Sequence, residues 1–121
     1  MARPYTELAL IPSQRLNKLA AMAKNRAKTK KLSYEIDGAY LLKLWNENQG
    51  CCALTGQPFD LTKWGGRGQV NPRAPSVDRI EPKLGYIPGN VRLITYHMNV
   101  ALTDFGIEEF ETLIRHYKEY A

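Results

Sequence analysis

The chain has 121 residues, of which 44% are hydrophobic and 24% are charged, and its formal net charge is +5 at pH 7. These values indicate one ordinary globular domain, exclude a wholly disordered chain and favour a polyanionic partner. No apolar run approaches the roughly 18 to 20 residues of a membrane span, and the N-terminus lacks the apolar core of a secretory signal. We therefore expect a cytoplasmic protein without membrane contact.

The positive charge is concentrated at the beginning of the chain. Residues 1–31 carry eight basic side chains and one acidic one, a net +7, whereas residues 32–121 carry nine basic and eleven acidic ones, a net −2. Phosphate contacts are independent of base sequence and weaken with salt, so we expect this segment to bind a nucleic acid backbone. The candidate residues are Arg15, Lys18, Lys24, Arg26, Lys28, Lys30 and Lys31. A solvated helix face or a disordered tail is the alternative interpretation.

Residues 13–31 have the pattern of a helix. Apolar residues recur at spacings of three and four and form a narrow stripe, made of Leu16, Leu19, Ala20, Ala23 and Ala27. Ser13 follows Pro12 and is available as the N-cap. We expect the stripe to pack against the domain body while the Lys and Arg heads stay in water.

Past this helix the pattern changes to a shorter helix, a loop and two strands. The second helix is expected between Asp37, which is suited to an N-cap, and Gly50. Residues 51–76 are rich in turn formers and predict an irregular loop region. Val77–Ile80 and Val91–Ile94 predict two short strands separated by a turn-rich stretch.

Two more helices are expected after the second strand. Thr95 is available as the cap of the first of them, and the residues from Thr103 to Gly106 separate it from a last helix over residues 107–120. The predicted order of helix, helix, loop, strand, strand, helix, helix belongs to the α+β class.

The segment around the two strands carries the most specific pattern. The run PSVDRIEP over residues 75–82 is followed by Gly85-Tyr86 and by GNVRLI over residues 89–94, and CALTG stands earlier at residues 52–56. This set of motifs resembles the HNH, or ββα-metal, nuclease superfamily, and most of all its phage-type members. The resemblance covers most of the chain and is specific around residues 76–102.

The resemblance implies a small ββα-metal core, in which a hairpin and a helix are flanked by further helices. We expect this HNH-like domain, with its C-terminal helix, at residues 37–121. Residues 1–36 are then a basic N-terminal helical arm.

Three residues match metal-site or bracing positions of the family. Asp78 matches the acidic member of the strand pair, which faces a divalent cation. Asn90 matches the central Asn, whose side chain braces the loop between the strands. Asn99 matches the last motif position, which supplies a ligand from the helix. The implied ion is Mg²⁺ or Mn²⁺, which prefers such hard oxygen ligands and needs open positions for a scissile phosphate.

Arg79 departs from the family, because it stands where the histidine that activates water is usual. Arginine stays protonated above about pH 12 and cannot act as that base. Either Arg79 binds a phosphate oxygen and stabilises the transition state, or the domain keeps the shape and has lost the reaction. A structural ion pair between Asp78 and Arg79 is the simplest alternative for these two residues.

His97 is a second candidate for the missing base, and we keep it with Asp78, Arg79 and Asn90 among the candidate catalytic residues. Helical geometry opposes this role, because His97 lies roughly 200° around the helix from Asn99. The positions that share the side of Asn99 are Thr95, Tyr96, Leu102 and Thr103.

Many HNH domains also hold a structural zinc with two Cys-x-x-Cys pairs. Here Cys52 keeps one position and Thr55 replaces its partner, while Thr95 and Met98 stand at the second pair. Cys51 is adjacent to Cys52, so these two cysteines complete neither a zinc site nor a disulfide framework. We expect reduced thiols and no structural zinc.

These observations predict a metal-dependent endonuclease of phage or prophage origin that cleaves DNA in the host cytoplasm, with RNA not excluded as a partner. Arg92 would extend the phosphate-binding surface around the hairpin. The alternative is a catalytically inactive HNH-like module that binds nucleic acid or a host protein. Either function is compatible with a monomer or a homodimer.

Overall fold

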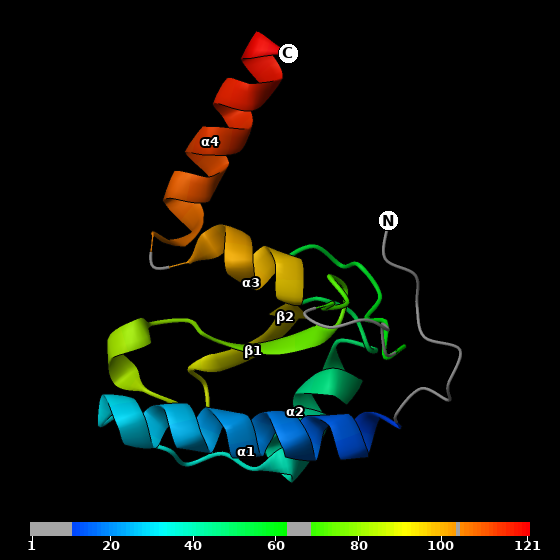
Figure 1. The fold of residues 1–121 in the computed structure, drawn as a ribbon, viewed down its shortest axis with the longest axis vertical. Helices are drawn as coiled ribbons and strands as arrows, with labels where there is room; N and C mark the ends of the chain where they lie inside the picture. Colours follow the sequence, from blue (N-terminus) through cyan, green and yellow to red (C-terminus); the bar gives the residue numbers. More distant parts are fainter. Residues whose placement is uncertain (1–10, 63–68, 104) are drawn as a thin grey trace.

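Four α-helices and one antiparallel hairpin make up the part of the chain that the structure, a computed structural model, describes; this part is residues 11–62, 69–103 and 105–121 (Figure 1). The α+β class predicted from the sequence is confirmed. In chain order the elements are α1 (Pro12–Lys30), α2 (Gly38–Glu47), β1 (Pro75–Arg79), a short 3-10 helix (Pro82–Leu84), β2 (Val91–Thr95), α3 (Tyr96–Leu102) and α4 (Gly106–Tyr120). None of the helices within these ranges combines the length and apolar composition that crossing a bilayer requires.

The first helix forms where its apolar periodicity predicts it and begins one residue earlier. Ile11 is the N-cap and makes no side-chain cap hydrogen bond, so Ser13 is not the cap. Pro12 explains the shift, because its fixed φ suits the first helical turn and its missing N–H costs nothing there. The helix ends at Lys31 in a left-handed conformation with φ of 57°.

The predicted apolar stripe of α1 is confirmed as a core face. Leu16, Ala20, Ala23 and Ala27 are buried, and the small alanines allow α2 and the hairpin to approach closely. The helix therefore shares one hydrophobic core with α2 and both strands. The proposed boundary at residue 36 stays a prediction, and residues 1–10 of the expected arm lie outside the described residues.

The second helix also begins as predicted. The Asp37 carboxylate accepts a hydrogen bond of 2.8 Å from the backbone N–H of Tyr40, which is the expected N-cap geometry. Gly38 follows at the place where α2 meets α1, and a Cβ there would collide with the side chain of Asn17. The start of α2 is thus set by the Asp37 cap and by the close packing of Gly38 against α1.

The hairpin pairs β1 with β2 in a register that aligns Asp78 with Arg92 and Val77 with Leu93. The segment after α1 attaches to the loop of the hairpin, because Tyr86 N–H donates to the carbonyl of Ser33 at 2.9 Å. Gly85 permits this contact, since a Cβ at Gly85 would lie 2.7 Å from the same carbonyl oxygen.

Two clusters of buried side chains flank the hairpin. The larger one joins α1, α2 and the strands, and the smaller one joins Cys52 and Ile94 with Met98 and Leu102 of α3. Figure 1 shows α1 and α2 on one side of the hairpin and α3 on the other, with α4 projecting away from the rest of the molecule. None of the residues of α4 is buried.

Candidate active site

One cavity of about 560 Å³ brings together residues from α1, both strands, α3 and the start of α4. Asp78 and Arg79 reach it from β1, Arg92 from β2 and Asn99 from α3. Four residues that the sequence singles out over a span of 22 positions therefore line the same cavity, although they stand on three different elements.

Asp78 forms an ion pair with Arg92, its partner across the hairpin. Nε of Arg92 lies 2.7 Å from Oδ2 of Asp78, and the two side chains are 24% and 16% exposed. The expected alternative of a pair between Asp78 and Arg79 is wrong, because the cross-strand register brings Arg92 to the carboxylate instead. The carboxylate is thus held in place by a cation that itself lines the cavity.

Arg79 is fixed by the loop that follows its strand. Its guanidinium donates a hydrogen bond to the carbonyl of Pro82 and lies 5.3 Å from the centroid of the Tyr86 ring. Arg26 of α1 lies 5.7 Å from the same centroid and donates from Nε to the Tyr86 hydroxyl at 3.1 Å. The buried ring of Tyr86 therefore positions two cations at the cavity wall, Arg26 from α1 and Arg79 from β1.

Tyr86 is a residue of the candidate site whose role the sequence does not predict. In the sequence it is only the second residue of the Gly85-Tyr86 motif, yet its side chain is buried and lines the cavity beside both arginines. A tyrosine directly after a turn glycine is the one signal in the sequence, and it reveals neither the burial of the ring nor the cations that the ring contacts.

Asn90 does not line the cavity and instead forms hydrogen bonds within the loop between the strands. Its Oδ1 accepts from the N–H of Glu81, and its Nδ2 donates to the carbonyls of Glu81 and Gly85 at 3.0 and 2.7 Å. The side chain is buried, and its hydrogen bond to the Gly85 carbonyl is shielded from water. This is the bracing geometry that the resemblance implies for Asn90.

Asn99 and His97 lie on different sides of α3. Asn99 donates from Nδ2 to the hydroxyl of Ser76 at 2.7 Å and lines the cavity. The exposed His97 instead forms a hydrogen bond of 3.1 Å with Oε1 of Gln57 and does not line the cavity. The structure therefore does not bring His97 to the candidate site. This agrees with helix geometry, in which two residues correspond to a rotation of roughly 200°.

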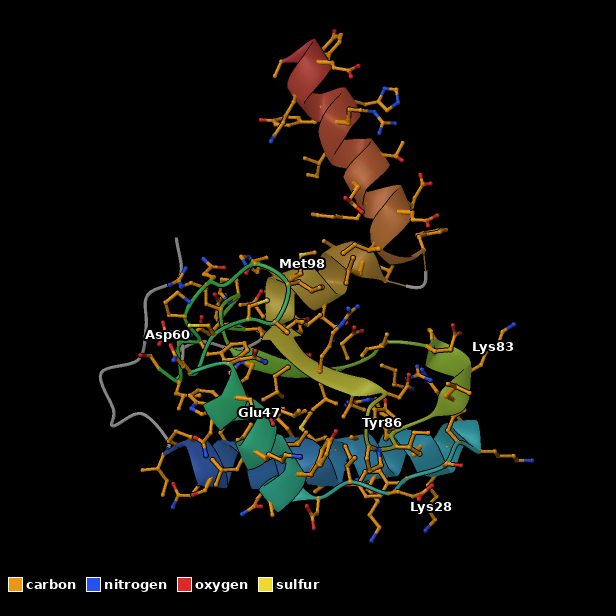
Figure 2. The ribbon with its side chains drawn as sticks, turned by 180° about the vertical axis from the view of Figure 1, so that it is seen from behind. Lys28, Glu47, Asp60, Lys83, Tyr86 and Met98 are labelled. Atoms are coloured by element: carbon orange, nitrogen blue, oxygen red, sulfur yellow. The ribbon has the colours of Figure 1, made fainter. Side chains whose placement is uncertain are left out.

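The basic residues of the first segment divide into two groups. Arg26 and Lys30 line the cavity, whereas Lys18, Lys24, Lys28 and Lys31 are exposed elsewhere. Figure 2 shows Lys28 on the side of α1 away from Tyr86.

Arg15 also lies outside the cavity lining. Its side chain is half-buried, and burial lowers the pKa of Arg15. The positive charge of α1 thus reaches the candidate site through only two of its seven predicted residues.

The divalent ion implied by the resemblance would need oxygen ligands in this cavity. Asp78 is the one carboxylate among the described lining residues, and Asn99 adds an amide. Across the described ranges no three His, Cys, Asp or Glu side chains are grouped to hold a metal. Mg²⁺ often takes one or two carboxylates and completes its shell with water and substrate phosphates. The donor set fits an ion that binds together with a phosphate, while the surrounding cations disfavour the ion alone.

The resemblance places zinc ligands at the positions of Cys52, Thr55, Thr95 and Met98, and Cys52 is buried in the smaller core cluster. Sγ of Cys52 accepts a hydrogen bond of 3.4 Å from the N–H of Thr95, and Met98 is buried in the same cluster. Burial would raise the pKa of Cys52, but hydrogen bonds from Thr55 and from backbone N–H groups outweigh it and lower the pKa. Cys52 is the only one of the four that can supply a thiolate.

Thr95 does not act as the side-chain cap of α3 that the sequence predicts. It occupies the N-cap position without a side-chain cap hydrogen bond. Its hydroxyl is buried and has no hydrogen-bond partner among the described residues. The helix α3 therefore begins without a side-chain cap.

The chain is similar to an uncharacterised 29.0 kDa protein from the dda-modA intergenic region of Enterobacteria phage T4. The two are 29% identical over 96 residues, which cover 79% of this chain and 34% of the phage protein. The chain thus spans about a third of the length of the curated relative that it matches. No family model and no solved structure matches the chain.

Proposed function

We propose that this chain is an HNH-type, metal-dependent endonuclease of phage origin that hydrolyses phosphodiester bonds of DNA in the host cytoplasm. The observation that carries the proposal is the shared cavity of Asp78, Arg79, Arg92 and Asn99. In this proposal β1, β2 and α3 are the ββα core. The similarity to a phage T4 protein supports the phage origin only.

The side chains that line the cavity have different roles in this proposal. Arg79 and Arg92 bind the oxygens of the scissile phosphate, because a guanidinium matches phosphate geometry and stays charged. Asp78 and Asn99 would hold Mg²⁺ or Mn²⁺, which supplies Lewis-acid stabilisation of the leaving oxygen when bound. Tyr86 keeps Arg79 oriented by stacking under its guanidinium.

The test is plasmid cleavage by the Asp78→Asn variant in Mg²⁺ and Mn²⁺. An asparagine still accepts the hydrogen bond from Arg92, so the hairpin stays folded while the metal loses its anionic ligand. We expect the cleavage rate to fall about a hundredfold or more. Glu47→Gln is the matched control, because Glu47 is exposed on α2 and should change nothing (Figure 2). A folded wild-type protein that cuts no DNA over a wide range of pH and metals would overturn the proposal.

A second candidate is a catalytically inactive module that binds nucleic acid. It is favoured by the charge of the cavity, where Arg26, Lys30, Arg79 and Arg92 face a single described carboxylate that is already paired. Such a module binds DNA in a salt-dependent way that survives both chelation and Asp78→Asn.

Arg79→His separates the two candidates. Gain of nicking by this variant would mean that the scaffold is complete and only the base was missing. Loss of cleavage that the wild type possesses would assign Arg79 a part in the reaction.

A further inference from the structure

Helix α4 carries an apolar stripe that the rest of the described chain covers only near its beginning, where Phe110 packs against the smaller core cluster. Ile107, Phe110, Ile114 and Tyr117 follow one another at spacings of three and four, which places them along one face. Leu113 widens this stripe at its middle. Leu113 is 64% exposed and Tyr117 is 68% exposed, and α4 projects away from the molecule in both views (Figures 1 and 2). An exposed apolar helix face of this kind marks a contact surface.

The charges beside the stripe identify what fits it. Glu111 and Lys118 lie seven residues apart, or almost two full turns, so they stand on the same edge of the stripe. The shallow groove along this edge is lined by Glu111 and Lys118 together with Phe110, Ile114 and Arg115. The edge is therefore acidic toward the beginning of the helix and basic toward its end.

We propose that α4 pairs with α4 of a second copy of this chain in an antiparallel, two-fold symmetric contact. In such a contact residue i meets residue j and j meets i. Glu111 of one copy then faces Lys118 of the other, and the same ion pair repeats across the axis. In a parallel arrangement the edge that carries Glu111 and Lys118 would face the opposite edge of the partner helix, so the two residues would not meet. Only the antiparallel arrangement pairs Glu111 with Lys118, and charge complementarity therefore selects it.

The pairing would also bring the second copy close to the cavity. Gly106 and Ile107 line the cavity and begin α4. In the antiparallel contact the basic end of the partner helix lies beside this beginning. The inference does not depend on the proposed nuclease function, because it stands on the face of α4 alone.

The test measures the oligomeric state by analytical ultracentrifugation over a range of protein concentrations. We expect a weak dimer, since one short helix buries less than the roughly 800 Å² per partner of a standard stable interface. Glu111→Lys and Lys118→Glu should each raise the dimer dissociation constant about tenfold, because each replaces two attractive pairs with two repulsive ones. Tyr117→Glu should abolish the dimer, and circular dichroism would show an unchanged core.

Charge restoration makes the test specific. A mixture of the Glu111→Lys and Lys118→Glu chains should form heterodimers, and both substitutions in one chain should restore the homodimer. Glu119→Lys is the matched control, because Glu119 lies on the opposite face of the same helix and should leave the dimer unchanged. A wild-type chain that stays monomeric to millimolar concentration, or a dimer insensitive to these substitutions, would overturn the proposal.

Discussion

Asn90 shows how one side chain organises the candidate site without lining it. Its amide satisfies one N–H and two carbonyls in the loop between β1 and β2. That loop contains Pro82, whose carbonyl accepts from Arg79, and Tyr86, on whose ring Arg79 stacks. The orientation of Arg79 therefore depends on Asn90 through the loop.

Replacing Asn90 with alanine should lower the free energy of unfolding by about 2 kcal/mol, because buried backbone groups lose their partners. Urea denaturation followed by circular dichroism measures this change. Asn46→Ala is the control, since Asn46 is exposed on α2 and the substitution should alter stability by less than about 0.5 kcal/mol. Equal stability of the Asn90 variant and the wild type would mean that the loop needs no brace.

The neighbours of some residues could be predicted from the sequence, and those of others could not. The angle between His97 and Asn99 follows from helix geometry, so their separation could be predicted. The partner of Asp78 could not, because a pair across two strands depends on a register that is set by the packing of both strands.

At the scale of elements, the connection between α2 and β1 is held by polar contacts around Asp60 and Asn71. Oδ1 of Asp60 accepts from the N–H of Thr62 at 2.8 Å, and Arg73 lies 3.7 Å from Oδ2. The buried Asn71 amide donates to the carbonyl of Thr62 at 2.9 Å. The sequence predicts an irregular segment here, but it does not reveal these contacts of Asp60 and Asn71.

These contacts predict a pH dependence of stability. Burial alone would raise the pKa of Asp60, but hydrogen bonds from Thr62 and Asn71 and the charge of Arg73 outweigh it and lower the pKa. A lowered pKa in the folded state stabilises the protein above the unfolded value of about 3.9 and loses this contribution as the pH falls through the folded value.

Asp60→Asn should therefore reduce stability at pH 7 and flatten the loss of stability in acid. Thermal unfolding at a series of pH values between neutral and acid measures both effects. Asp37→Asn serves as the comparison, because asparagine keeps the N-cap of α2. A parallel pH profile for wild type and Asp60→Asn would contradict the assignment.

For the whole molecule, the position of α1 decides where the positive charge acts. The sequence concentrates a net +7 in residues 1–31, but the packing of Leu16, Ala20, Ala23 and Ala27 sets which basic residues meet the hairpin. Arg26 and Lys30 line the cavity, whereas Lys24 and Lys28 do not.

We therefore expect the basic residues of α1 to contribute unequally to DNA binding. The double variant Arg26→Gln with Lys30→Gln should weaken binding about tenfold and reduce the slope of log affinity against log salt by about 2. Lys24→Gln with Lys28→Gln removes the same charge from the same helix and should change affinity less than about twofold. Fluorescence anisotropy at several salt concentrations measures both, and equal losses would mean that the whole helix surface binds phosphate.

The α+β class, the order of the elements, most helix and strand limits within a residue or two, and the N-cap at Asp37 could all be predicted from the amino-acid sequence. These features depend on apolar periodicity and turn chemistry, which act between residues close in the chain. Three features became visible only in the folded molecule: Arg92 pairs with Asp78, Tyr86 contacts two arginines, and α4 leaves most of its apolar face exposed. Each of these depends on contacts between segments far apart in the chain, and their geometry follows from packing, which no local pattern encodes.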